Sequence, residues 1–224
     1  MSAERSADIP DSKALEADKA RALSLTPVSR ETQNGLEELV ELLFLWQRTT
    51  NLVASSTLPL VWTRHVSDSL QLLPLAPDAR VFADLGSGAG FPGLVIACAL
   101  KGRPGAHVHL VESTGKKAAF LREAIGITGV PATVHHERVE NFAANFAGKL
   151  DAVTARALAP LPQLLKLSAP LLKSGVVGLF PKGQDVEAEL TAAAKSWNVQ
   201  YDLTPSKTDP AARIVVVRKL ERAA

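Results

Sequence analysis

An aspartate and a run of alternating glycines lie between two apolar segments of this sequence. The apolar segment 81–85 contains Asp84 and leads directly into a glycine-rich turn over 86–93. Glycine reaches positive φ and lets a ligand approach the backbone closely, so a strand, turn and helix of this kind can hold a nucleotide-like cofactor. The next apolar segment, 107–111, ends at Glu112, whose carboxylate can accept both hydroxyls of a ribose.

The glycine spacing fits two cofactors. Residues 88–93 satisfy the dinucleotide fingerprint of NAD-binding proteins, with Glu112 at a tolerable distance. However, the apolar segment ends at Leu85, so Gly86 is the first glycine of the turn and follows shortly after Asp84. This register favours S-adenosylmethionine, which has no phosphate for the turn to bind, and Asp84 would then shape or contact the loop near the amino-acid end. A turn without a ligand, and a surface carboxylate at Glu112, are the structural alternatives.

Alternating strand and helix patterns predict the elements that position these residues. From residue 81 onward the pattern favours a parallel sheet covered by helices on both faces. We expect a Rossmann-like, doubly wound α/β fold, mostly parallel, with an antiparallel C-terminal edge. The predicted strands are 81–85, 107–111, 132–136, 150–155, 176–180, 199–203 and 213–217. One helix is predicted directly after the glycine turn and another from residue 113. Two more are predicted over 161–172 and 186–197.

Two amphipathic helices are predicted before the sheet. The first follows Ser29, a favourable N-cap residue, and the second ends before Pro74. Their apolar residues are Leu36, Leu39, Val40, Leu43 and Trp46 in the first helix and Leu58, Val61, Trp62, Val66 and Leu70 in the second. We expect a helical cap over 29–77 that forms one compact unit with an α/β domain over 78–224. Residues 1–28, rich in alanine, serine and mixed charge, are expected to be a disordered, mobile extension.

Length and composition favour one large domain. The chain has 224 residues, of which 46% are hydrophobic, and a formal net charge of +2. That charge is too small to identify a nucleic-acid partner, so attraction to phosphate would need basic residues clustered on one face. The single cysteine, Cys98, excludes an internal disulfide and a multi-cysteine metal site, and no metal is predicted. Because no apolar run reaches membrane-spanning length and no secretory signal is evident, we expect a cytoplasmic protein.

The residues that accompany the turn narrow the choice of methyl acceptor. Transfer to a pyrimidine carbon needs a cysteine nucleophile, but Cys98 follows the turn among apolar residues and is expected in the core. Transfer to an exocyclic amine usually comes with an Asn/Asp-Pro-Pro-aromatic loop after the fourth strand, where this chain has Thr154 to Leu158. Guanine N7 carries a free lone pair and no proton, so direct attack needs neither nucleophile nor base. Catalysis would then depend mainly on alignment.

A set of motifs in a fixed order resembles one known family. They are Arg64–Leu70, Asp84–Gly93, Glu112-Ser113 with Lys116-Lys117, Arg138–Glu140, Ala155–Ala157 and Pro181–Gly183. Over about residues 36–219 the chain resembles the RsmG family, formerly glucose-inhibited division protein B, the bacterial 16S ribosomal RNA (guanine-N7) methyltransferases. The resemblance implies a class I S-adenosylmethionine-dependent methyltransferase fold, with S-adenosylmethionine as cofactor. It also implies 16S rRNA within an assembled or partly assembled small subunit as partner, and we expect a monomer.

The resemblance also implies roles for single residues. The implied cofactor-binding residues are Asp84, Gly86, Gly88, Phe91, Glu112, Val139, Glu140 and Arg156. Glu112 would hold the ribose, and Val139 and Glu140 would flank the adenine. Arg156 would lie at the mouth of the pocket, touch cofactor or RNA, and be the candidate for positioning the substrate. Without the resemblance, Val139 can also be a core residue and Glu140 a carboxylate at the start of a helix. Arg156 can also belong to a structural ion pair.

Four basic residues are candidates for RNA contact: Lys116, Lys117, Lys182 and Arg213. They are expected to gather near the carboxyl ends of the strands, although each lysine singly also fits a solvated surface group. His65 and Asp68 lie three residues apart and resemble an acid–base pair. Because N7 chemistry gives them no proton to remove, we expect them to dock the cap against the glycine turn, with substrate contact as the second role.

Two other functions stay open on the sequence. An NAD-dependent oxidoreductase would use the alternative glycine register and would bind a nicotinamide cofactor. A non-catalytic RNA-binding or assembly protein would keep only the fold and would bind RNA whether or not cofactor is present. Titration with each cofactor separates the first from a methyltransferase, and an assay for methylated RNA separates the second.

Overall fold

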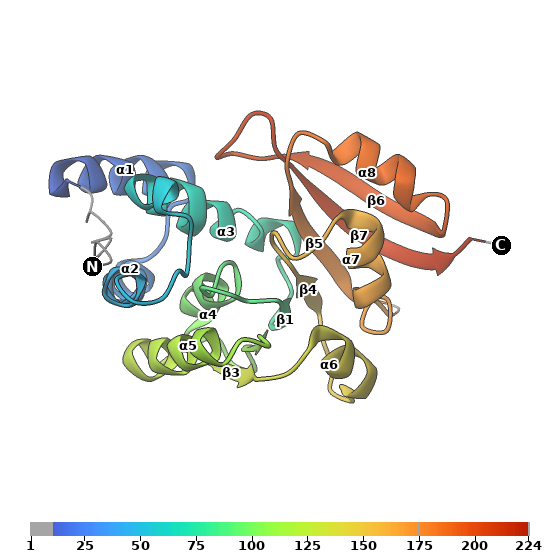
Figure 1. The fold of residues 1–224 in the computed structure, drawn as a ribbon, viewed down its shortest axis with the longest axis horizontal. Helices are drawn as coiled ribbons and strands as arrows, with labels where there is room; N and C mark the ends of the chain where they lie inside the picture. The colour runs from blue at the N-terminus through green and yellow to red at the C-terminus, as the bar shows by residue number, and fades with distance from the viewer. Residues whose placement is uncertain (1–10, 174, 224) are drawn as a thin grey trace, which may run out of the picture.

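The computed structural model describes residues 11–173 and 175–223, and Figure 1 shows a central twisted sheet with helices on both faces. The sheet has seven strands in the order β3-β2-β1-β4-β5-β7-β6. The strands are β1 (Val81–Leu85), β2 (His107–Val111), β3 (Ala132–His135), β4 (Ala152–Thr154), β5 (Val177–Lys182), β6 (Trp197–Pro205) and β7 (Arg213–Arg222). Strands β1 to β5 are parallel, and β7 runs antiparallel to both β5 and β6. The predicted doubly wound sheet with an antiparallel C-terminal edge is confirmed.

The helices associated with the sheet are α4 (Gly93–Leu100), α5 (Gly115–Thr128), α6 (Val139–Asn145), α7 (Leu161–Ser168) and α8 (Val186–Ala193). Helix α7 is shorter than predicted because Pro170 follows its C-cap and disfavours helical continuation at the residue before it. The prediction that helix 186–197 includes Trp197 is wrong. Trp197 instead begins β6, where it pairs with Arg222 of β7 and lies under that guanidinium.

The N-terminal part is more ordered than the sequence predicted. Helix α1 (Ser12–Leu25) packs against the cap, so a mobile extension over 1–28 is wrong for the residues of this helix, while 1–10 lie outside the described part. The order comes from Asp18, which is buried and accepts hydrogen bonds from the backbone N–H groups of Trp62 and Thr63 at 2.9 and 3.1 Å. A carboxylate with such partners holds α1 in place.

The cap consists of α2 (Arg30–Gln47), η1 (Ser55–Leu60), η2 (Trp62–Ser67), α3 (Asp68–Leu70) and η3 (Leu73–Leu75). As predicted, Ser29 caps α2 by accepting a hydrogen bond from the Thr32 backbone N–H. The second predicted helix is a succession of 3₁₀, π and α turns rather than one α-helix. Its five predicted apolar residues are nevertheless all buried.

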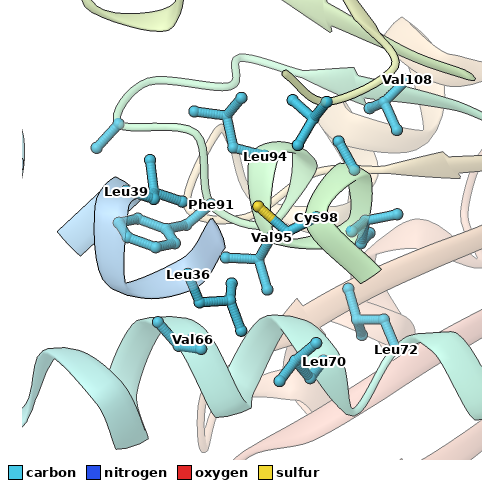
Figure 2. Close-up of a cluster of buried hydrophobic side chains, with 14 of the residues drawn as sticks. Leu36, Leu39, Val66, Leu70, Leu72, Phe91, Leu94, Val95, Cys98 and Val108 are labelled. Atoms are coloured by element: carbon cyan, nitrogen blue, oxygen red, sulfur yellow. The ribbon is translucent and has the colours of Figure 1, made fainter. Parts of the chain in front are cut away.

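Two hydrophobic clusters lie on opposite faces of the sheet. The larger cluster joins the cap and α4 to one face of the sheet. Figure 2 shows Leu36 and Val66 of the cap near Val95 and Cys98 of α4. Cys98 is a core residue as predicted, and burial raises the pKa of its thiol to about 12. The second cluster lies under α6, α7 and α8. Because cap and sheet share one core, they pack as a unit, whereas a boundary at residue 78 stays a prediction.

No helix in the described ranges 11–173 and 175–223 is long and apolar enough to cross a membrane.

Candidate functional site

The glycine turn lies where β1 leaves the sheet. Gly86, Gly88 and Gly90 all have positive φ, at 68°, 55° and 83°. The turn is closed by a hydrogen bond of 2.7 Å from the Gly90 N–H to the Ser87 carbonyl oxygen, and the Ser87 N–H binds the carbonyl oxygen at the end of β2. A residue that carries a side chain is strained at such φ values. The backbone of the turn is therefore fixed, and within it only Gly86 and Gly88 are partly exposed.

Asp84 connects the end of β1 to the start of α4 through hydrogen bonds. Its carboxylate is 1% exposed and accepts hydrogen bonds from Thr154 Oγ1 at 2.8 Å and from the Gly93 N–H, the first residue of α4, at 3.1 Å. Burial raises the pKa of Asp84 to about 6, although these hydrogen bonds oppose the rise. The predicted role in shaping the loop matches this geometry. A direct contact between Asp84 and a cofactor stays a prediction.

Glu112 is bound to the turn rather than exposed as a surface carboxylate. It is 6% exposed, and its Oε2 accepts the Gly88 N–H at 2.9 Å while Oε1 accepts the Thr114 N–H at 2.6 Å. Each carboxylate oxygen has a second lone pair that can accept a further hydrogen bond. Glu112 is therefore placed, beside the glycine turn, to accept hydroxyl groups.

Arg156 links the cap to the sheet. Its Nη1 donates to the Arg64 carbonyl oxygen at 2.9 Å and to Asp68 Oδ2 at 3.2 Å, and its Nη2 donates to His65 Nδ1 at 2.7 Å. The guanidinium also lies over the Phe91 ring, 5.4 Å from its centroid. Burial lowers the pKa of Arg156, while Asp68 opposes that change. Three of the five N–H donors of Arg156 are thus engaged by protein partners, as in the ion-pair alternative, and a contact with cofactor or RNA stays a prediction.

His65 is fixed in one neutral tautomer. Since Nδ1 accepts from Arg156, Nε2 carries the proton and donates to Thr57 Oγ1 at 2.9 Å, and that hydroxyl donates in turn to the Ala54 carbonyl oxygen. The imidazole stacks on Phe91 with 5.0 Å between ring centroids. Burial, with Arg156 and Arg64 nearby, lowers its pKa to about 3. The predicted docking of the cap against the glycine turn is what these contacts do.

A cleft of about 380 Å³ opens next to Arg156, between the cap, the ends of β4 and β5, and the loop joining β6 to β7. It is lined by Arg64, His65, Asp68, Arg156, Ala157, Pro181, Lys182, Gly183, Ser206, Thr208, Asp209, Ala212, Arg213 and Ile214. Its volume is within the range of roughly 300–1,000 Å³ common for small-molecule sites.

The predicted basic residues are only partly brought together. Lys182 and Arg213 both line the cleft, on paired strands β5 and β7. Lys182 forms an ion pair of 2.7 Å with Glu189, and Arg213 donates to two carbonyl oxygens of the preceding loop. Lys116 and Lys117 lie in the first turn of α5 and are not among the cleft residues. The four basic residues therefore do not form a single patch around the cleft.

The adenine-flanking candidates lie at the start of α6, which follows β3. Val139 is buried and belongs to the second hydrophobic cluster, as its core alternative required, while Glu140 is exposed in the first turn. Both positions lie after the carboxyl end of a parallel strand, where open α/β sheets bind ligands. Their contact with adenine stays a prediction.

Sequence reasoning missed the contribution of the loop 206–212, which brings Ser206, Thr208 and Asp209 to the cleft. Its ends pair antiparallel in β6 and β7, so the loop returns beside the end of β5. The predicted antiparallel edge was the available signal, because a strand antiparallel to β5 must begin at the carboxyl end of that strand. Arg64 was likewise part of a quoted motif but had no predicted role.

The residues around the turn fit S-adenosylmethionine. The turn has backbone amides and little side-chain bulk, a Cβ at Gly88 would meet only the Gly86 carbonyl at 3.8 Å, and Glu112 supplies a hydroxyl acceptor. No phosphate-binding helix start is needed for this cofactor.

The strand order and this turn define the class I, Rossmann-like methyltransferase fold. An O-methyltransferase from Bacillus cereus, solved in complex with SAH, has a similar fold, with a TM-score of 0.62 and 16% identity over 92% of this chain and 100% of that chain. An SAH-bound methyltransferase from Podospora anserina matches with a TM-score of 0.61 and 12% identity, covering 93% and 96% of the two chains.

Sequence comparison gives the family. The family model for rRNA small subunit methyltransferase G, GidB, matches residues 32–210. A ribosomal RNA small subunit methyltransferase G from Bradyrhizobium sp. strain BTAi1 is 58% identical over 94% of this chain and 95% of its own length. A protein of the same name from Rhodopseudomonas palustris strain BisB18 is 53% identical over 98% and 94%. The chain belongs to the rRNA small subunit methyltransferase G family, as the motifs predicted.

Proposed function

We propose that this protein transfers a methyl group from S-adenosylmethionine to N7 of a guanine in 16S ribosomal RNA, within an assembled or partly assembled small subunit. Membership of the family makes the chain an S-adenosylmethionine-dependent methyltransferase of small-subunit ribosomal RNA. The finer elements of the proposal are the guanine, its N7 atom, and a monomeric enzyme in the cytoplasm.

Residues of the turn hold the cofactor in this proposal. When bound, S-adenosylmethionine supplies a methyl group attached to a positively charged sulfur. Gly86, Gly88 and Phe91 line its pocket, Glu112 accepts the ribose hydroxyls, and Val139 with Glu140 flanks the adenine. Asp84 keeps the turn and the start of α4 together through Thr154 and Gly93.

The observation that carries the choice of N7 is the state of His65. A histidine that acts as a general base must present an unprotonated ring nitrogen to its substrate, but both ring nitrogens of His65 are engaged, one by Arg156 and one by Thr57. Asp68 is similarly occupied by Arg156, Gln71 and Thr208. Guanine N7 has a lone pair and no proton, so it can be methylated without either group acting as a base. Alignment of the reactants can then contribute up to about 7 to 11 kcal/mol.

Contact with RNA is proposed for Lys182 and Arg213 at the cleft and for Lys116 and Lys117 on α5. Cations at the mouth of a cleft attract phosphates and fix the register of the nucleic acid without reading its sequence. The folded ribosomal RNA then supplies much of the specificity by presenting an unstacked guanine.

The direct test uses small subunits that lack the modification. The protein is incubated with these subunits and cofactor labelled in the methyl group, and the modified base is mapped by mass spectrometry of nuclease digests. Label recovered as N7-methylguanosine in 16S RNA is expected. Label on another base or only on protein would refute the choice of acceptor.

Two binding titrations separate the remaining functions. Calorimetric titration with S-adenosylhomocysteine should show one site, whereas an NAD-dependent oxidoreductase would change the fluorescence of NADH. A non-catalytic RNA-binding protein would bind small subunits equally well with and without cofactor and would form no methylated base.

A further inference from the structure

The loop 206–212 is held against the cap by buried polar side chains. Gln71 is 4% exposed, and its Nε2 donates to Ser206 Oγ at 3.1 Å while its Oε1 accepts the Lys207 N–H at 2.8 Å. Thr208 Oγ1 donates to Asp68 Oδ1 at 2.8 Å. Because Gln71 and Asp68 belong to the cap, these hydrogen bonds give the loop a defined position beside the cleft.

Asp209 is presented to the cleft by this fixed loop. Its Oδ1 accepts the Ala211 N–H at 3.0 Å in a local turn, and its Oδ2 lies 3.1 Å from Arg64 Nη1. Both side chains of the pair line the cleft, and they are 36% and 48% exposed. An ion pair this exposed contributes little to stability and can be exchanged for other partners.

Three other charged groups of the cleft are each held by more than one protein partner. Asp68 receives hydrogen bonds from three side chains and is 17% exposed. Arg156 is bound to three acceptors, and the Lys182 ammonium group is bound to Glu189 and to the Ala159 carbonyl oxygen. Of the two carboxylates that line the cleft, Asp209 is therefore the one whose partner can readily be replaced.

We infer that Asp209 reads the Watson–Crick edge of the target guanine and so determines base specificity, an inference that rests on the proposed guanine-N7 function. Guanine presents two neighbouring donors on that edge, N1–H and the N2 amine, and a carboxylate accepts both with its two oxygens. Adenine has an acceptor at N1 and no amine at C2, so it would leave Asp209 without these partners. On entry, the guanine replaces Arg64 at Asp209.

The arrangement also orients N7. In guanine, N7 lies on the side of the ring system away from N1 and N2, so a base bound to Asp209 by its Watson–Crick edge directs N7 away from the loop. Outside the loop 206–212, the lining of the cleft includes His65 of the cap and Arg156 and Ala157 of the segment after β4. His65 and Arg156 both contact Phe91 of the glycine turn, so this is the side on which the cofactor is proposed to bind.

The test replaces Asp209 by asparagine in the full chain. Asparagine keeps an oxygen for the Ala211 N–H but exchanges the second acceptor for a donor that opposes the guanine N–H groups. We expect kcat/KM on undermethylated small subunits to fall on the order of 100-fold, because a site built to bind a polar group discriminates strongly when the match is lost. Affinity for S-adenosylhomocysteine should not change. Asp202→Asn is the matched control, since Asp202 of β6 forms an exposed ion pair of 2.9 Å with Arg218 of β7, outside the cleft.

A second measurement separates base reading from a structural effect of the loop. Small subunits are reconstituted with inosine, which lacks the N2 amine, in place of the mapped guanine. The wild-type protein should methylate inosine more slowly than guanine, whereas Asp209→Asn should lose most of that preference. If Asp209→Asn matches Asp202→Asn, or if it is slower but keeps the full preference for guanine over inosine, the inference is overturned. If the wild-type protein forms no N7-methylguanosine, it is the proposed function that fails.

Discussion

Arg156 couples the cap to the sheet through geometry that no other side chain reproduces. Its planar fork reaches a backbone carbonyl, the Asp68 carboxylate and the His65 ring at once, with distances of 2.9, 3.2 and 2.7 Å. A lysine has all its donors on one atom and cannot satisfy three acceptors spread over this range. The guanidinium therefore links the cap to the glycine turn in a way that lysine cannot reproduce.

Arg156→Lys should lower the free energy of unfolding by about 1–3 kcal/mol, because at least one partly buried acceptor loses its donor. Urea denaturation followed by circular dichroism measures this. Arg218→Lys serves as the control, since Arg218 forms an exposed ion pair with Asp202 and should change stability by less than about 0.5 kcal/mol. Equal stability of the two variants would show that Arg156 does not act as a structural link.

Gly86→Val tests whether the turn is the cofactor pocket. Gly86 has φ of 68°, and a Cβ there would lie 2.6 Å from Leu158 Cδ1, so a branched side chain strains the turn, displaces the Leu158 side chain and narrows the pocket. We expect affinity for S-adenosylhomocysteine to fall at least about 10-fold by calorimetry, equivalent to about 1.4 kcal/mol. Gly102→Val is the matched control, because Gly102 has a similar φ of 79° with no atom within 4 Å of a Cβ. Similar affinities for both variants would place the pocket elsewhere.

At the scale of elements, the sequence predicted what depends on local pattern. The strand ending at Leu85, the positive-φ glycines and the N-cap at Ser29 each have a short-range cause, and each is confirmed. Helix α1 was missed because its order depends on Asp18 reaching the backbone of a segment 44 residues away. The part of the cleft formed by the loop 206–212 was missed for the same reason, since Gln71 and Asp68 fix it from 135 or more residues away.

Helix α1 should be held by one side chain in particular. Asp18 accepts two backbone N–H groups at the start of η2 and the Thr63 hydroxyl, so it acts as an N-cap supplied from another helix. Asp18→Ala should lower the free energy of unfolding by about 1–3 kcal/mol, because buried donors lose their acceptor. Glu16→Ala, two residues earlier and with a side chain 71% exposed, is the control and should have little effect. Hydrogen exchange of α1 amides measures the local effect, and protection unchanged by Asp18→Ala would contradict the assignment.

At the scale of the whole molecule, the site lies where the order of the strands in the sheet reverses. The chain builds outward from β1 through β2 to β3 and then returns to add β4 and β5 on the other side, so the strand order reverses between β1 and β4, where open α/β sheets bind ligands. Asp84 and Thr154 are register partners on these two strands and are joined by a hydrogen bond. The cap and the loop 206–212 close over the same end of the sheet, which brings cofactor turn and cleft together.

Two buried groups at this junction give stability opposite dependences on pH. The pKa of His65 is lowered from 6.5 to about 3, so its contribution to stability is present above pH 6.5 and is lost as the pH falls toward 3. The pKa of Asp84 is raised from 3.8 to about 6, so its contribution is present below pH 3.8 and is lost as the pH rises through 6. Between pH 4 and 6 the two effects oppose each other in the wild-type protein.

His65→Gln removes one of these effects and leaves the other. Glutamine has no titratable group, so the variant should gain stability relative to the wild-type protein as the pH is lowered from 6.5 to 4. The change should be no more than about 3 kcal/mol, since one pKa unit corresponds to about 1.4 kcal/mol. Urea denaturation of both proteins at half-unit steps of pH measures the difference. If the difference in unfolding free energy is the same at pH 7 and pH 4.5, the imidazole is not held in its neutral form by Arg156 and the cap.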